Sequence, residues 1–155
     1  MKSIMSLLSV VFVTAALGLG LVSNAQAQDA FTGQGTFALS LTSGDNEAGE
    51  GIATVDQDGN IAGSLILNLP APDGGRQVVP AVVAGTQTVN ADGTGTADIT
   101  LTLPDGSSLP RSFDFVIRRA KKHGNSILAT ETRYVEREAS LTGKVAIIDA
   151  TRLPD

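Results

Sequence analysis

The chain has 155 residues, no cysteine, one histidine and a formal net charge of −5 at pH 7. The lack of cysteine excludes disulfide bonds, zinc–thiolate sites and cysteine nucleophiles. The acidic balance argues against non-specific nucleic-acid binding, which requires many cations to neutralise phosphates, so we expect no nucleic-acid partner.

Residues 1–27 have the pattern of a secretory signal peptide. Lys2 supplies a positive charge, the run from Ile4 to Val22 is almost entirely apolar, and Ala25 to Ala27 form a small-x-small cleavage signal. An uncleaved anchor is the alternative, because the apolar run is just long enough to span a bilayer. We expect cleavage and an exported protein, periplasmic or extracellular, with no integral membrane segment and with its first residue near Gln28.

The remaining residues, 28–155, are enough for a single domain with one core. Their charge is unevenly distributed. Residues 28–110 contain ten acidic residues and a single base, Arg76, whereas residues 111–155 contain nine basic and six acidic residues. This asymmetry would suit self-association or a polarised surface, and the simpler interpretation is a solubilising surface.

Short runs of alternating apolar and polar residues, separated by Gly, Asp, Asn and Pro clusters, predict an all-β domain. Runs joined by short turns pair antiparallel. With no helix to cover the sheet, closure is needed to remove exposed strand edges. We therefore predict a single antiparallel β-barrel of about eight strands, with a β-sandwich as the alternative. The predicted strands are Thr36–Thr42, Gly51–Val55, Ile61–Leu69, Gln77–Ala84, Thr86–Val89, Thr94–Leu103, Ser112–Arg119, Ser126–Thr132 and Ser140–Asp149.

Four local features carry their own expectations. Pro80 marks an edge strand or a bulge, and residues 121–125 form a turn. Gly143 is a bulge or a point of close packing. Residues 133–139 form either a short helical turn or a charged edge strand.

The basic run Arg118, Arg119, Lys121 and Lys122 is a weak candidate for an anion-binding site, for a phosphate, a lipid head group or an anionic polymer. The simpler interpretation is a solubilising hairpin tip that protects an edge. His123 adjoins this run, and no triad signature accompanies it, so we expect a solvated histidine.

Asp56, Asp58 and Asn60 present oxygen ligands at alternate positions, as a calcium loop does. Such a loop needs a glycine at its sixth position and a glutamate at its twelfth. Here Gly59 is fourth and Leu67 is twelfth, so a hairpin turn explains the same residues and we expect no metal.

Asp114 alternates with Phe113 and Phe115 along a predicted strand. If the phenylalanines are core, Asp114 faces solvent, which the drive to bury phenylalanine favours. In the alternative, Asp114 points inward and orients a ligand together with Arg133 or Arg137.

Several glycine and turn motifs are similar to those of a known class: Gly33–Phe37, Gly85, Val89–Ala97, Phe113–Val116 and Leu141–Gly143. The sequence resembles small exported bacterial proteins of unknown function with a calycin-like or allene oxide cyclase-like β-barrel. Gln87 stands where those proteins often carry tyrosine. The resemblance implies a barrel and, by analogy of fold, an apolar ligand in its mouth or interior.

Three functions remain open. The first is an exported non-enzymatic barrel that binds a small apolar ligand, such as a fatty acid or a retinoid, in its interior. The second is a structural or interaction module of the cell envelope, which binds a protein partner or itself. The third is a barrel isomerase or cyclase that acts by shaping its substrate. No G-x-S-x-G motif is present, and we assign no catalytic residue and expect no cofactor.

Overall fold

The computed structural model describes residues 30–44, 46–138 and 144–154, and these form an all-β domain. The predicted signal peptide at 1–27 and the predicted bulge at Gly143 lie outside the described residues. No helix of the described residues has the length and hydropathy to cross a membrane. The described residues form nine strands: β1 Ala30–Thr32, β2 Gly35–Ser43, β3 Ala48–Val55, β4 Asn60–Pro70, β5 Arg76–Val89, β6 Thr94–Thr102, β7 Ser108–His123, β8 Ser126–Glu136 and β9 Ala146–Arg152.

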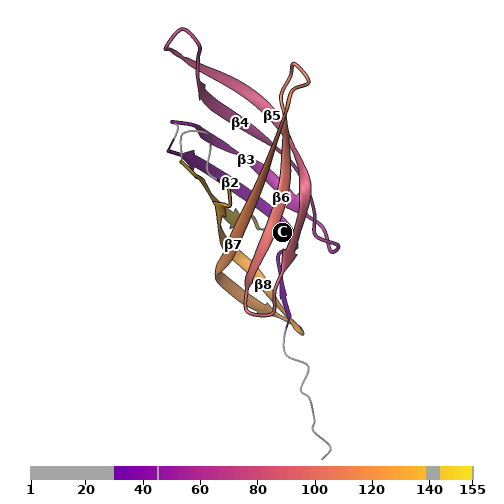
Figure 1. The fold of residues 1–155 in the computed structure, drawn as a ribbon. Coiled ribbons are helices and arrows are strands. Elements are labelled where there is room, and N and C mark those ends of the chain that lie inside the picture. Colours follow the sequence, from indigo (N-terminus) through magenta and orange to yellow (C-terminus); the bar gives the residue numbers. More distant parts are fainter. Residues whose placement is uncertain (1–29, 45, 139–143, 155) are drawn as a thin grey trace, which may run out of the picture.

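Strands β2 to β9 close into an antiparallel barrel of eight strands (Figure 1). Each strand from β2 to β8 pairs with the next one along the chain, and β9 pairs with both β8 and β2. The predicted barrel is therefore confirmed, and the sandwich alternative is wrong. We call the end with the β3–β4, β5–β6 and β7–β8 turns the lower end, and the opposite end the upper end.

Strand β1 is an addition that no alternation in the sequence predicts. Its residues Ala30–Thr32 pair in parallel with Ser126–Leu128 of β8. Further along β8, residues Glu131–Val135 pair with β9. Because β7 occupies the other edge of β8, β1 and β9 share one edge, and β1 covers a stretch that would otherwise expose unpaired backbone groups.

The hairpin of β7 and β8 is longer than predicted. Lys121, Lys122 and His123 were expected in a turn, but they belong to β7 and pair with Leu128, Ile127 and Ser126. Only Gly124 and Asn125 make the turn, and Gly124 has a φ of 60°. The expectation was wrong because ladder pairing with β8, which the local composition does not reveal, keeps these polar residues extended. Residues 133–136, left open above, are part of β8.

Strand β5 is one continuous strand of 14 residues, where two shorter strands were predicted. Its pairing with β6 begins at Val82, whereas its pairing with β4 extends to Arg76. Pro80 therefore lies in a part of β5 that has a single neighbour, as its missing N–H requires. This part belongs to the β4–β5 hairpin, which projects beyond the barrel at the upper end (Figure 1).

The inward faces of the strands form one core. The largest fully buried side chains are Phe113, Leu41, Leu65, Leu67 and Leu101. Glycines allow neighbouring strands to approach closely inside the barrel. A Cβ added to Gly85 would lie 2.2 Å from the carbonyl oxygen of Asp98 on β6. Alternation along the strands therefore separates a packed interior from a solvated exterior, as predicted.

Candidate functional site

A small apolar cavity occupies the middle of the barrel interior. Its volume is about 40 Å³. Alanines on three different strands, Ala53, Ala97 and Ala150, leave this space because their side chains are short. The lining residues are Phe37, Leu39, Ala53, Val55, Ile61, Val83, Ala97, Ile99, Phe113, Tyr134, Ile148 and Ala150.

Tyr134 brings the one polar side chain among these lining residues. Its ring packs edge-on against Phe113 and lies 5.0 Å, centroid to centroid, from the ring of Phe115. Its hydroxyl donates a hydrogen bond of 2.9 Å to Oε1 of Gln87. Burial raises the pKa of the Tyr134 hydroxyl well above its ordinary value, so this group is a neutral hydrogen-bond donor at physiological pH.

Gln87 on β5 is buried, with 8% of its surface exposed, and it is held from two sides. Its backbone N–H donates to the carbonyl oxygen of Gly59 over 2.8 Å. Its amide nitrogen lies so close to Gly33 that a Cβ there would be 2.1 Å away. Gln87 is thus a fixed polar side chain toward the lower end of the barrel, hydrogen-bonded to Tyr134, which lines the cavity.

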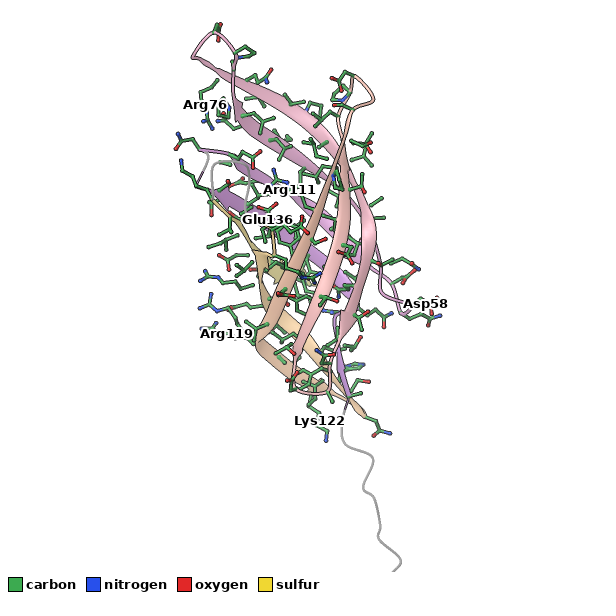
Figure 2. All side chains as sticks on the ribbon, in the orientation of Figure 1. Asp58, Arg76, Arg111, Arg119, Lys122 and Glu136 are labelled. Carbon is green, nitrogen blue, oxygen red and sulfur yellow. The ribbon has the colours of Figure 1, made fainter. Side chains whose placement is uncertain are left out.

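An ion-pair cluster lies in the upper end of the interior. Nη2 of Arg111 on β7 donates to both carboxylate oxygens of Glu47, at 2.9 and 2.8 Å. Its Nη1 lies 3.5 Å from Oε1 of Glu136 on β8, and Oε2 of Glu136 accepts from the N–H of Ala146. Figure 2 shows Arg111 and Glu136 side by side within the barrel. The cluster links the upper ends of β7, β8 and β9 to Glu47, which immediately precedes β3.

The predicted anion-binding run lies on β7, toward the lower end (Figure 2). Arg119 forms an exposed ion pair of 2.9 Å with Glu131, and Arg118 lies 3.8 Å from Asp149. Lys121 and Lys122 continue the same strand. The two arginines thus already have acidic neighbours, with which an anion would have to compete. Anion binding by this run stays a prediction. His123 is exposed at the end of β7.

The carboxylate of Asp56 accepts hydrogen bonds within the turn in which it lies. It accepts hydrogen bonds from the backbone N–H groups of Asp58 and Asn60 and from the side-chain amide of Asn60. These bonds lower the pKa of Asp56 below its ordinary value, the Asn60 side chain contributing most. The residues that resemble a calcium loop therefore form the hairpin turn inferred from the sequence.

Asp114 faces solvent and pairs with Arg137 on the outside of the barrel, at 3.1 Å, with 64% of its side chain exposed. Phe113 and Phe115 are buried, so the solvent-facing interpretation is confirmed. None of the candidate site residues predicted from the sequence lines the cavity, whereas Phe37, Ala97 and Phe113, which belong to the quoted glycine and turn motifs, do. Tyr134, Gln87 and Arg111, the polar residues of the interior, were not predicted as site residues; Gln87 was noted only because the resembling proteins often carry tyrosine there. The alternation of β5 puts Gln87 on the same face as Val83, which was the one available signal.

No protein-family model matches the sequence, and no curated protein matches it. Similar solved structures include a redesigned β-barrel, mFAP1, bound to DFHBI. It is 16% identical with a TM-score of 0.46, and the match covers 77% of this chain and 94% of that chain. A second redesigned barrel, b11L5F_LGL, is 13% identical with a TM-score of 0.45, covering 78% and 91%. A third structure, from the de novo design of a fluorescence-activating β-barrel, is 13% identical with a TM-score of 0.41, covering 77% and 93%.

Proposed function

We propose that this protein is an exported, non-enzymatic barrel that binds a small apolar molecule in its interior. The observation that carries the proposal is the cavity of about 40 Å³ in the middle of the closed barrel. Eleven of its twelve lining side chains are hydrocarbon, with Tyr134 as the exception. Apolar cavities in proteins stay free of water and accept small apolar molecules, because no polar wall group compensates the loss of water's hydrogen bonds.

The size of the cavity restricts the ligand. An engineered protein cavity of about 150 Å³ holds benzene, and the cavity here is several times smaller. A long fatty acid or a retinoid, as the sequence suggested, would require the interior to open considerably. We therefore infer a compact ligand, or the thin end of an alkyl chain.

The test is saturable binding inside the barrel. Xenon, a single compact atom, is the probe, and its binding is followed by methyl NMR in sealed tubes. We expect saturable shifts of Ile, Val and Ala methyl groups that line the cavity. Ala97→Val places two further carbons in the cavity and should weaken binding at least about tenfold, because the volume is taken.

Ala84→Val is the matched control, because it adds the same atoms to an exposed position on β5. It should leave probe binding unchanged. The proposal fails if the unmodified protein shows no saturable shifts, or if Ala97→Val and Ala84→Val have the same effect. A separate experiment looks for the natural ligand. Native mass spectrometry of protein purified gently from an exporting host would report such a ligand as mass lost on denaturation.

An exposed apolar surface on the outside of β3, β4 and β5 favours a second candidate, a module that associates with a second copy of itself. Ile52 is 50% exposed, Ile66 60%, Val78 68% and Val82 60%. Contiguous surfaces of this kind mark interaction sites. Glu50 pairs with Ile66 in register and brings a negative charge into this surface.

Light scattering after size exclusion, over a hundredfold range of protein concentration, tests this candidate. We expect a dimer that Ile66→Ser dissociates, while Val116→Ser, at a position 45% exposed on β7, leaves it intact. A monomer at every concentration would eliminate self-association. An equal effect of both substitutions would place the contact elsewhere.

A further inference from the structure

A second, polar pocket opens at the lower end of the barrel. We call it the lower pocket, and residues 31–34, 55–59 and 87–89 line it. Val55 is the one residue that it shares with the lining of the apolar cavity. Its volume is about 270 Å³. Because an engineered cavity of about 150 Å³ holds benzene, the lower pocket has room for a six-membered ring with polar substituents.

Gln87 brings an unused hydrogen-bond donor to the wall of this pocket. The buried Tyr134 hydroxyl needs an acceptor and takes Oε1 of Gln87, which leaves the amide nitrogen Nε2 on the side of Gly33. Nε2 occupies the place that a side chain at position 33 would take, and Gly33 itself lines the pocket. Among the residues that the structure describes, Nε2 has no hydrogen-bond partner, and it is not sealed from the pocket. A ligand with an acceptor group would satisfy this donor.

The charged groups of the lower pocket are two carboxylates. Asp56 and Asp58 line it, and no Lys or Arg of the described residues does. Asp56 accepts hydrogen bonds within its own turn. The carboxylate of Asp58, labelled on the β3–β4 turn in Figure 2, has no hydrogen bond or ion pair with the described residues. Its oxygens can accept from a hydroxyl group, and both carboxylates repel an anion.

The rest of the wall combines polar and hydrocarbon groups. Gln34, Gln57 and Thr88 supply side-chain amide and hydroxyl groups, and Phe31 and Val89 supply hydrocarbon surface. A ring that carries several hydroxyl groups matches such a wall. Each hydroxyl both donates and accepts a hydrogen bond, and the C–H groups of the ring gain dispersion contacts against hydrocarbon.

We propose that the lower pocket binds a neutral ring polyol of the size of a monosaccharide, at a site separate from the interior binding proposed above. One hydroxyl oxygen accepts from Nε2 of Gln87, and another hydroxyl donates to Asp58. Phe31 and Val89 contact the C–H groups of the ring. Acidic sugars are the disfavoured class.

The experiment titrates the full domain with glucose, galactose and their uronic acids, glucuronate and galacturonate. Amide NMR is the assay, because the side-chain NH₂ group of Gln87 gives its own signals. At least one neutral sugar should shift the signals of the Gln87 side chain and the Gly33 backbone in a saturable way. The corresponding uronate should bind about threefold more weakly, because its charge meets exposed carboxylates whose effect solvent screens.

Two variants test the contacts separately. Gln87→Met has a similar length without the amide, and it should weaken sugar binding at least about fivefold, as expected for one lost hydrogen bond. Asp58→Asn changes an exposed side chain and should narrow the difference between the sugar and its uronate. Asp73→Asn is its matched control, because Asp73 is exposed in the β4–β5 turn at the opposite end of the barrel. It should leave the difference unchanged.

The proposal is wrong if no neutral sugar gives saturable shifts, or if Gln87→Met binds the sugar as tightly as the unmodified protein. Tighter binding of the uronates, or equal effects of Asp58→Asn and Asp73→Asn, would overturn the assigned charge selectivity. Each of these failures leaves xenon binding in the apolar cavity untouched, so the two sites are tested independently.

Discussion

Replacing Arg111 by methionine should destabilise the barrel more than removal of an ordinary surface ion pair. Met keeps an apolar stem but leaves Glu47 and Glu136 facing each other without the cation. The side chains of Arg111, Glu47 and Glu136 are only 15%, 18% and 12% exposed. Leaving a buried charge without its partner costs about 3–5 kcal/mol. Because these side chains keep some contact with solvent, we expect a loss of about 2–3 kcal/mol in the free energy of unfolding.

The assay is urea unfolding at pH 7, followed by circular dichroism. The control is a triple variant that combines Arg111→Met with Glu47→Gln and Glu136→Gln. Glutamine removes both charges, and its carbonyl oxygen can still accept from the N–H of Ala146. The triple variant should recover at least half of the lost stability. A loss below about 1 kcal/mol in Arg111→Met, the range of exposed pairs, would refute the reasoning, as would a triple variant no more stable than the single one.

Three further predictions concern the fold. Gly85→Ala should cost about 1–3 kcal/mol, because its Cβ would meet the backbone of β6, whereas Gly75→Ala should be nearly neutral in the same unfolding assay. Asp56→Ala should lower Tm at pH 7. The lowered pKa of Asp56 means that its contribution is present above the ordinary value of 3.8 and is lost as pH falls through the folded-state pKa, so the two Tm curves should converge in acid; parallel curves would refute this. Replacing all four residues of the basic run, Arg118, Arg119, Lys121 and Lys122, by serine should change the free energy of unfolding by less than about 1 kcal/mol. A larger loss would show that these side chains have partners within the protein.

The strands that alternate cleanly were predictable because their signal is local. Thr94–Leu103 was predicted and β6 spans Thr94–Thr102, with Ala97, Ile99 and Leu101 buried. Burial of one face imposes a period of two on the sequence itself. The turns with glycine at their tips were equally readable, since Gly59, like the other turn glycines, adopts the positive φ that its turn requires.

Pairing between distant segments was not predictable from composition. Residues 121–123 look like a turn and become strand only because β8 offers a ladder beside them. β1 has three residues, too few to show a period, and its partner lies near residue 127. The same limit applies to the site. Tyr134 and Gln87 are 47 residues apart, and barrel closure and strand register alone bring them together.

The cavity makes a last prediction that joins stability to function. An unfilled volume in a core costs about 24 cal/mol per Å³, so a cavity of about 40 Å³ lowers stability by about 1 kcal/mol. Ala97→Val should therefore raise the free energy of unfolding by about this amount while it weakens probe binding at least about tenfold. Stabilisation with loss of binding is the signature of a site whose shape is kept at the expense of packing. If Ala97→Val instead destabilises the protein, the interior is already full at this position, and the proposed binding site is wrong.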